Sequence, residues 1–183
     1  MEREKLLIKI SQILEKLNIP YLVTGGIAVA AWGRVRATFD IDIVIEIEKT
    51  KISSLVQAIK TIYKTGYIDK EMAEEAIETE GEFNFIQPET GLKVDFWIKK
   101  ENPFSKNEFA RRVPQQIGEY KVYFVSPEDL ILQKLQWYKM SEVSKHLEDI
   151  ESILKISKID LKYIKEWIEK QSTKKLFEEI LKK

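Results

Sequence analysis

The sequence predicts an α+β domain followed by a purely helical region. In residues 1–125, short apolar or alternating runs typical of strands are interspersed with segments whose apolar residues recur at helical spacing. In residues 126–183 only the helical spacing continues. No internal repeat or low-complexity linker separates the two parts, so we expect the helical region to pack on the α+β domain.

The first part is expected to hold several helices and strands in mixed order. Pro20 marks the end of the first helix, and Pro88-Glu-Thr-Gly91 has the residues of a hairpin turn. The expected elements are helix 3–17, strand 21–24, a turn at Gly25-Gly26, helix 27–32, strand 38–48, helices 51–64 and 70–79, strands 82–87 and 92–98, helix 105–111 and strand 121–125.

A strong helix-start signal opens the second part. Ser126-Pro-Glu-Asp129 combines an N-cap serine, proline at the first helical position and two acids in the first turn. Helices are expected at 127–139, 142–156, 160–170 and 173–182.

The composition limits the class of protein. The chain of 183 residues fits one domain, or a compact domain with a helical appendix, and 44 % hydrophobic residues can form a sizeable core. The 30 basic and 30 acidic residues balance, so no net field favours nucleic acid, although a local basic patch remains open. The absence of cysteine excludes disulfides and thiolate metal sites.

The start of the chain shows no targeting signal. Met1-Glu-Arg-Glu-Lys leads directly into an amphipathic pattern, and no apolar run approaches the ~20 residues that span a bilayer. We therefore expect a cytoplasmic protein with no membrane partner. The abundance of Ile, Lys and Glu without Cys is typical of a thermophilic source.

Two aspartates one residue apart are the most informative feature. Asp40 and Asp42 lie on an expected strand, where residues i and i+2 project from the same face, about 6.5 Å apart. Ile41 and Ile43 would then face the core. Two carboxylates directed at one point repel each other unless a cation lies between them, so this pattern predicts a magnesium site.

Asp95 is the best third acid. It lies in the otherwise apolar run Leu92-Lys-Val-Asp-Phe-Trp-Ile98, where an unpaired carboxylate is costly and calls for a partner such as a metal. The alternative is an aspartate held by backbone hydrogen bonds or an arginine. Three carboxylates on adjacent strands would suit two-metal phosphoryl or nucleotidyl transfer.

Gly25-Gly26 offers a second element of such a site. Backbone N–H groups at a helix N-terminus favour phosphate, and glycine allows a triphosphate to approach the backbone closely. The alternative is a plain strand-to-helix turn. The position of the pair about fifteen residues before Asp40 favours the phosphate interpretation.

The glycine turn, the segment Arg36-Ala-Thr-Phe-Asp-Ile-Asp42 and Val94-Asp95-Phe96 together resemble the polymerase-β type nucleotidyltransferase superfamily. Ser126-Pro-Glu-Asp-Leu-Ile-Leu-Gln-Lys134 and Glu148-Asp149-Ile150 more closely resemble the AbiEii-like toxin branch and its uncharacterised relatives. The resemblance covers residues 21–155. It implies a nucleotidyltransferase-like mixed sheet flanked by helices, followed by a C-terminal helical bundle.

The resemblance also implies roles for single residues. Asp40 and Asp42 would bind Mg²⁺ or Mn²⁺, and Asp95 would be the third ligand or the base for the incoming hydroxyl. A nucleotide-binding group would comprise Gly25, Gly26, Arg36, Thr38 and Lys134. Asp149 would orient Lys134 or the acceptor.

Several of these residues have simpler interpretations. Lys134 would by default be a solvated lysine on a helix, and Arg36 would pair with one of the acids. His146 stands where many toxin relatives carry an acid, and its charged surroundings predict exposure. Trp137-Tyr138 would be core or would stack on a base, and Arg111-Arg112 would be an exposed pair or contact an acceptor phosphate.

These patterns favour a metal-dependent nucleotidyltransferase that moves a nucleoside monophosphate from an NTP to an acceptor hydroxyl. The resemblance suggests an RNA or transfer-RNA end, a partner protein's side chain, or a small aminoglycoside-like acceptor. The alternative is a non-catalytic nucleotide sensor or interaction module, such as a toxin–antitoxin component. A phosphohydrolase is disfavoured because such enzymes use His-Asp clusters and the chain has one histidine. The sequence leaves the base preference and the oligomeric state open.

Overall fold

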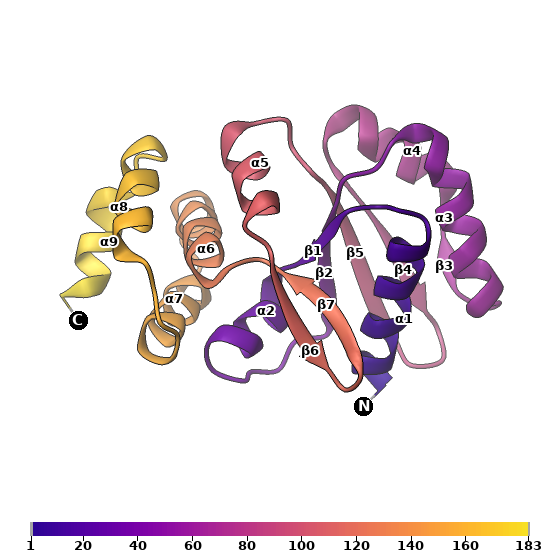
Figure 1. Cartoon of the computed structure of the whole chain (residues 1–183), viewed down its shortest axis with the longest axis horizontal. Helices are drawn as coiled ribbons and strands as arrows, with labels where there is room; N and C mark the ends of the chain where they lie inside the picture. The colour runs from indigo at the N-terminus through magenta and orange to yellow at the C-terminus, as the bar shows by residue number, and fades with distance from the viewer. Residues whose placement is uncertain (1, 183) are drawn as a thin grey trace. The chain divides into compact units, whose positions relative to one another are not determined.

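The computed structural model describes residues 2–182, which divide into two compact units. The first unit comprises the residues up to Ile27 together with Ala37–Phe124. The second comprises Ala28–Arg36 together with the residues from Val125 onward. The first holds the sheet and the second is helical (Figure 1). The predicted α+β fold with a mixed sheet, flanking helices and a C-terminal helical region is confirmed.

The sheet of the first unit has seven strands within the described residues. They are β1 Tyr21–Val23, β2 Asp40–Ile45, β3 Tyr67–Ile68, β4 Glu82–Gln87, β5 Leu92–Ile98, β6 Val113–Ile117 and β7 Tyr120–Phe124. Their spatial order is β3-β4-β5-β2-β1-β7-β6. The pairs β2–β5 and β1–β7 are parallel and the other pairs antiparallel, so β2 lies in the middle of a mixed sheet.

Nine helices complete residues 2–182. The first unit holds α1 Glu2–Lys16, α3 Lys49–Ile62, α4 Lys70–Thr79 and α5 Pro103–Ala110. The second holds α6 Pro127–Ser141, α7 Ser144–Ile156, α8 Leu161–Lys170 and α9 Lys174–Leu181. Helix α2, Gly25–Trp32, begins in the first unit and ends in the second. In this described part, no helix is long and apolar enough to cross a membrane.

The apolar face of the sheet is covered by helices. Ile41, Ile43 and Ile45 project from one face of β2 and are fully buried. Tyr21 pairs with Ile45 across β1 and β2, and its hydroxyl donates to Glu15 of α1 over 3.1 Å, which places α1 on that face. Helix α3 packs on α1 and α4 packs on α3 (Figure 1). Asp40 and Asp42 therefore project from the opposite face.

The second unit is organised around α6. This helix packs against α7 and α8, and α9 packs against α8. Ser126 caps it as predicted, because its hydroxyl accepts the Asp129 N–H over 3.1 Å, with Pro127 at the first helical position. Trp32 holds residues 28–36 in this unit: its indole N–H donates to the Val125 carbonyl, and its own carbonyl accepts from the Ser157 hydroxyl.

Some expected elements differ in the structure. The strand expected at 38–48 is shorter, Asp40–Ile45, and Gly25 and Gly26 are the first residues of α2 instead of a separate turn. Strands β3 and β6 were not expected. Strand β3 has two residues, too few for an alternating pattern, and β6 includes Pro114, which lowers strand propensity but is tolerated on an edge strand.

The aromatic pair Phe83 and Phe96 gives a test of this core. The rings stack with centroids 5.0 Å apart, and both side chains are buried. We expect Phe96→Ala to lower the free energy of unfolding by about 3–5 kcal/mol, because it removes this contact and leaves a cavity. Phe39→Ala is the control, since Phe39 is 80 % exposed, and it should change stability by no more than about 0.5 kcal/mol. Denaturant titration measures both, and equal effects would contradict this description of the core.

Candidate active site

The pairing of β2 with β5 brings the predicted acids together. In this parallel pair Asp42 lies opposite Asp95, and Asp40 lies opposite Lys93. Neighbouring strands run about 4.8 Å apart, and alternate residues share a face. Asp40, Asp42, Lys93 and Asp95 thus form a block on one face of the sheet, which we call the acid face.

Lys93 supplies the positive charge of the acid face. Its Nζ lies 2.9 Å from Asp95 Oδ2 and 4.0 Å from Asp40 Oδ1. The Asp95 side chain is 11 % exposed, so the lysine balances a largely buried carboxylate. The hydrogen bond to Asp95, together with the charges of Asp95, Asp40 and Glu82, outweighs burial and raises the pKa of Lys93. The partner expected for Asp95 was a metal or an arginine, and the structure provides this lysine.

Strand β4 adds two polar side chains to the acid face. Asn84 lies opposite Asp95 in the antiparallel β4–β5 pair, and Glu82 projects from the same side two residues earlier. Burial, followed by the Asp95 charge, raises the pKa of Glu82. Lys93, Glu82 and Asn84 were missed from the sequence. They could have been found from the predicted hairpin. Pairing its two strands from the turn outward places Asn84 opposite Asp95, and the alternation of side chains places Glu82 and Lys93 on the same face.

The start of α2 is pressed against the Asp42 carboxylate. Gly25 has φ +63°, and a Cβ added there would lie 1.8 Å from Asp42 Oδ2. The Thr24 N–H donates to the Asp42 carbonyl over 2.9 Å and fixes the approach of the two segments. The carboxylate therefore lies at a helix N-terminus, which is the positive end of the helix dipole.

Thr38 is placed in the same way against the second glycine. A Cβ on Gly26 would lie 2.5 Å from Thr38 Oγ1, and this hydroxyl donates to the Asp40 carbonyl over 3.4 Å. The first unit thus brings together five predicted site residues besides Asp95: Gly25, Gly26, Thr38, Asp40 and Asp42.

The acid face suits a divalent ion by its carboxylate oxygens, although two of its carboxylates, Asp95 and Asp40, lie close to Lys93. Within residues 2–182, no group of three or more Asp, Glu, His or Cys side chains is arranged to hold a metal. The ammonium of Lys93 contacts Asp95 and approaches Asp40 instead. Carboxylate oxygens are nevertheless the ligands that Mg²⁺ and Mn²⁺ prefer, and the absence of a Cβ on Gly25 allows the Asp42 carboxylate to lie against the start of α2.

A second charged cluster lies in the helical unit and contains the other predicted residues. Arg36 donates from Nε to Asp149 Oδ1 over 2.8 Å and from a terminal nitrogen to Oδ2 over 3.1 Å. Lys134 Nζ lies 3.0 Å from Asp149 Oδ2. The Asp149 side chain is 0 % exposed and that of Lys134 8 %, so the expectation of a solvated Lys134 is wrong. Arg36 pairs with an acid, as its simpler interpretation predicted.

The Asp149 carboxyl is ionised in this cluster. Burial acts to raise its pKa, but the hydrogen bonds and charges of Arg36 and Lys134 outweigh burial and lower it. His146 lies nearby and is half-buried, not exposed as expected. Burial, and then the Lys134 charge, lower the pKa of His146, so this side chain is neutral at pH 7. Its Nδ1 is enclosed without a hydrogen-bond partner among the described residues.

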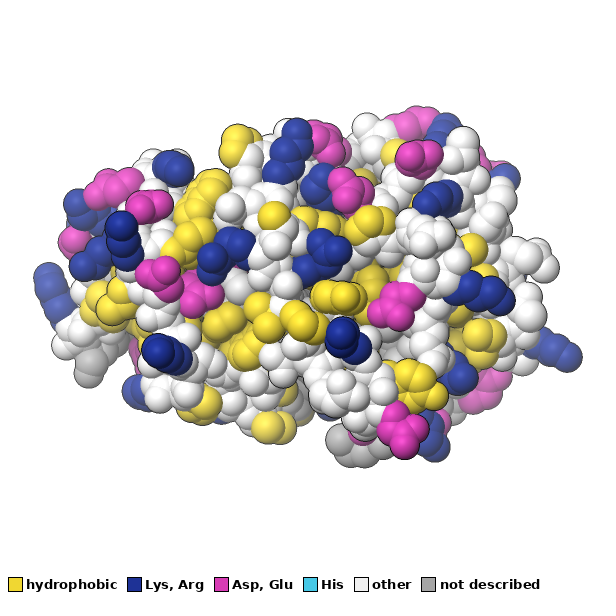
Figure 2. Space-filling model, in the orientation of Figure 1, with side chains coloured by type: hydrophobic (Ala, Val, Ile, Leu, Met, Phe, Trp, Pro, Cys, Tyr) yellow, Lys and Arg dark blue, Asp and Glu magenta, His cyan; other side chains and the backbone are white. Residues whose placement is uncertain are grey.

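The structure also shows where Trp137 and Arg112 lie. Trp137 is exposed, so its assignment to the core is wrong. Arg112 lies over the Tyr123 ring, 5.2 Å from its centroid, and donates to the Phe109 carbonyl, which gives it a structural role. On the face shown in Figure 2, basic and acidic side chains are interspersed, and neither sign fills a large continuous area.

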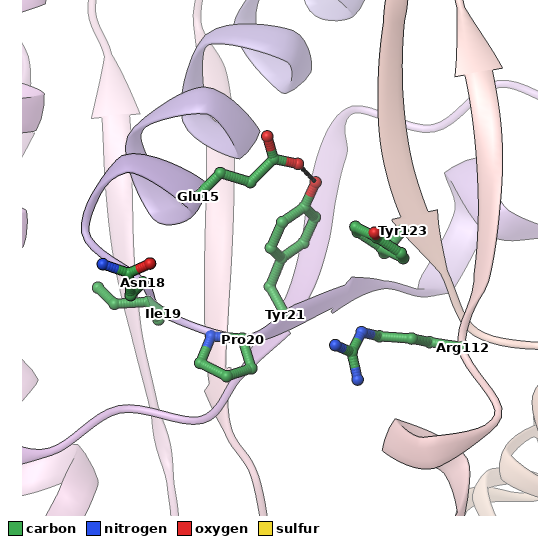
Figure 3. Close-up of a pocket in the computed structure, with 7 residues that line it drawn as sticks. All are labelled: Glu15, Asn18, Ile19, Pro20, Tyr21, Arg112 and Tyr123. Atoms are coloured by element: carbon green, nitrogen blue, oxygen red, sulfur yellow. Dashed lines mark hydrogen bonds between the residues drawn. The ribbon is translucent and has the colours of Figure 1, made fainter.

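A hollow elsewhere in the first unit is separate from the acid face. Figure 3 shows Tyr21 and Tyr123 lining it, with Glu15 at one end and Arg112 at the other. Tyr21 belongs to the helix-covered face of the sheet, and burial raises the pKa of its hydroxyl well above the ordinary value. This hollow therefore lies on the side of the sheet opposite Asp42.

A mixed sheet with paired acids on its central strand, beside a glycine-led helix, defines a nucleotidyltransferase fold. The chain belongs to the family described as "Nucleotidyltransferase of unknown function (DUF6036)", whose model matches residues 4–182. The superfamily resemblance is thus confirmed, whereas the finer resemblance to AbiEii-like toxins stays a prediction. No sequence among the curated proteins matches the chain.

Solved structures share the fold at low identity. ANT(2")-Ia in complex with adenylyl-2"-tobramycin has a TM-score of 0.62 and 16 % identity, covering 97 % of this chain and 99 % of that one. The lincosamide antibiotic adenylyltransferase LnuA, lincomycin-bound, has a TM-score of 0.57 and 16 % identity, covering 86 % and 98 %. An antigenic nucleotidyltransferase-like protein from Paracoccidioides brasiliensis has a TM-score of 0.57 and 19 % identity, covering 82 % and 74 %.

Gly25→Ala tests the contact between α2 and Asp42. The added Cβ would collide with the carboxylate, so we expect a larger loss of stability than from the left-handed backbone alone, which costs about 1–2 kcal/mol. Gly91→Ala is the matched control, because Gly91 has φ +68° and its Cβ would meet nothing within 4 Å. Chemical denaturation compares the two variants. If both variants lose the same free energy of unfolding, position 25 requires glycine only for its positive φ, and the contact with Asp42 contributes nothing.

Asp149→Asn tests the buried cluster. The change removes the negative charge that Arg36 and Lys134 both contact and should destabilise the protein by about 3–5 kcal/mol at neutral pH. Because the folded pKa of Asp149 is lowered, its stabilisation is present above the unfolded value, about 3.9, and is lost as pH falls through the folded pKa. Glu148→Gln is the control, since it breaks only the exposed pair with Arg34 and should cost at most ~1 kcal/mol. Unfolding is measured from pH 7 down to pH 3, and a difference between wild type and Asp149→Asn that does not shrink in acid would exclude the carboxylate charge as its cause.

Proposed function

We propose that this protein is a divalent-metal-dependent nucleotidyltransferase that moves a nucleoside monophosphate from an NTP to an acceptor hydroxyl. The observation that carries the proposal is the acid face, with three aspartates on adjacent central strands and Asp42 pressed against the glycine start of α2. Family membership supports the same reaction class.

Each residue of the acid face has a role in this proposal. Asp40, Asp42 and Asp95 would hold Mg²⁺ or Mn²⁺, which when bound neutralises triphosphate charge and makes the acceptor hydroxyl easier to deprotonate. The N–H groups at Gly25 and Gly26 would donate to phosphate oxygens at the positive end of α2. Thr38 would support them through its contact with Gly26.

The transfer itself is a substitution at the α-phosphorus. The acceptor oxygen forms a bond to this phosphorus, the bond from it to the bridging oxygen breaks, and pyrophosphate leaves. Asp95 would accept the hydroxyl proton or act as the third ligand, as the sequence suggested. Most of the rate enhancement would come from positioning the two substrates and from preorganised charges that stabilise the transition state.

The cluster of the helical unit would contribute positive charge. Arg36 and Lys134 share the single carboxylate of Asp149, so the three groups carry a net charge of about +1 near neutral pH. Such a cluster suits a phosphate group of the nucleotide or of the acceptor. Asp149 would hold both cations in place.

The acceptor is a molecule with a free hydroxyl. The ANT(2")-Ia structure contains adenylyl-2"-tobramycin and the LnuA structure contains lincomycin. Both proteins match this chain over nearly their whole length, which favours a small-molecule acceptor. The resemblance to AbiEii-like toxins instead favours an RNA end or a protein side chain. The presence of all three acids argues against a non-catalytic sensor, because the Asp95 side chain is only 11 % exposed and a carboxylate at such a position costs stability.

Label transfer tests the proposal. The protein is incubated with Mg²⁺ or Mn²⁺, each α-labelled NTP in turn, and either an aminoglycoside and lincosamide set, total cellular RNA, or cell protein. We expect Asp42→Asn to lower transfer at least about a hundredfold, since even residues behind a metal ligand contribute 10–100-fold. Glu119→Gln, at an exposed position, serves as the matched carboxylate control and should transfer normally.

Each outcome of the label transfer has a defined meaning. The labelled species identifies the acceptor class. Metal-dependent NTP binding without transfer to any pool would indicate a sensor, and release of phosphate instead of pyrophosphate would indicate a phosphohydrolase. Equal transfer by wild type and Asp42→Asn would refute the assignment of the acid face.

A further inference from the structure

We propose that Lys93 permanently fills one of the two cation positions of the acid face, so that the site binds a single divalent ion with its nucleotide. This inference rests on the proposed function, since it assumes that the acids hold a divalent ion. It departs from the two-metal arrangement that the three acids suggest when considered alone.

The contacts of Lys93 match those of a shared ion. Its Nζ lies 2.9 Å from Asp95 Oδ2 and 4.0 Å from Asp40 Oδ1, so one ammonium serves acids of two neighbouring strands. In two-metal sites, bridging of this kind is performed by a cation that shares carboxylates. Asp42 is directed elsewhere, toward the start of α2, where its Oδ2 lies against Gly25.

The position of Lys93 is fixed by the sheet. It lies on β5 directly opposite Asp40, in the same parallel ladder that sets Asp95 opposite Asp42. Its side chain is 35 % exposed, so the aliphatic part is enclosed while the ammonium reaches the acids. The pairing of β2 with β5 therefore keeps Lys93 beside Asp40 and Asp95.

The ammonium of Lys93 disfavours a second divalent ion. It already offsets part of the negative charge of Asp40, Asp95 and Glu82. A second divalent ion on Asp95 would have to displace Lys93 or lie a few ångströms from its ammonium, and like charges at that distance repel strongly in a partly enclosed site. The single ion is then expected between Asp40 and Asp42, on the side where the triphosphate meets α2.

Counting bound Mn²⁺ tests this inference without a measurement of activity. The protein is titrated with Mn²⁺ in an equimolar mixture of the four α,β-methylene ribonucleoside triphosphates, which resist transfer. Bound ions are counted by electron paramagnetic resonance after subtraction of Mn²⁺ on free nucleotide. We expect one ion per wild-type chain, one in Lys93→Arg, and two in Lys93→Met.

Lys99→Met is the matched control. Lys99 directly follows β5 and pairs with Glu46 and Glu101, so its loss removes a positive charge that is more enclosed than that of Lys93 and that contacts other acids. The count should stay at one. Circular dichroism and thermal melts confirm folding. If Lys93→Met does not fold, Lys93→Gln replaces it and should likewise bind two ions.

The outcomes separate this inference from the proposed function. Two ions in wild type, or one ion in a folded Lys93→Met, would overturn the role of Lys93 and leave the transferase proposal standing. No bound Mn²⁺ in wild type or in any Lys93 variant would overturn the proposed function itself. A change from one to two ions that is confined to Lys93→Met supports the inference.

Discussion

The parallel pairing of β2 with β5 is the constraint on which the site depends. On the covered face of the sheet, Ile41 lies opposite Val94 and Ile43 opposite Phe96, and all four side chains are fully buried. Because side chains alternate, a shift of one residue would place Lys93 and Asp95 in this core and expose its apolar residues. The apolar face therefore fixes the register, and the register places Asp42 beside Asp95. Burial on one side of the strand pair determines where the carboxylates meet on the other.

The faces of single strands could be predicted from the sequence, but their pairing across the chain could not. The Asp-Ile alternation of β2 and the hairpin of β4 and β5 are local patterns, and both were identified. The alignment of Asp40 with Lys93 joins strands that are about fifty residues apart and follows from the packing of the whole sheet. The position of Lys93 could have been predicted locally, because it stands two residues before Asp95 and so shares its face of the strand.

Residues of the helical unit show a related limit. Lys134 follows Leu130 by four positions and Ile131 by three, so it lies on the apolar side of α6, where a charge needs a partner. That partner, Asp149, is on another helix, so the pair was suggested by the family resemblance and not by a local pattern. Arg36 is 113 residues from Asp149 in sequence, and only the packing of residues 28–36 into the helical unit joins them. A lysine on the apolar face of a helix thus indicates an acidic partner on a neighbouring element.

The two charged clusters are opposite in sign. The acid face holds three aspartates with one lysine, whereas the helical cluster holds one aspartate with two cations. A fold selected only for stability gains little from such imbalances, because enclosed ion pairs at best offset the loss of hydration. Excess negative charge suits a divalent ion, and excess positive charge suits phosphate. A metal–nucleotide complex contains both a divalent cation and phosphate, so the charge of each cluster matches one part of the proposed substrate.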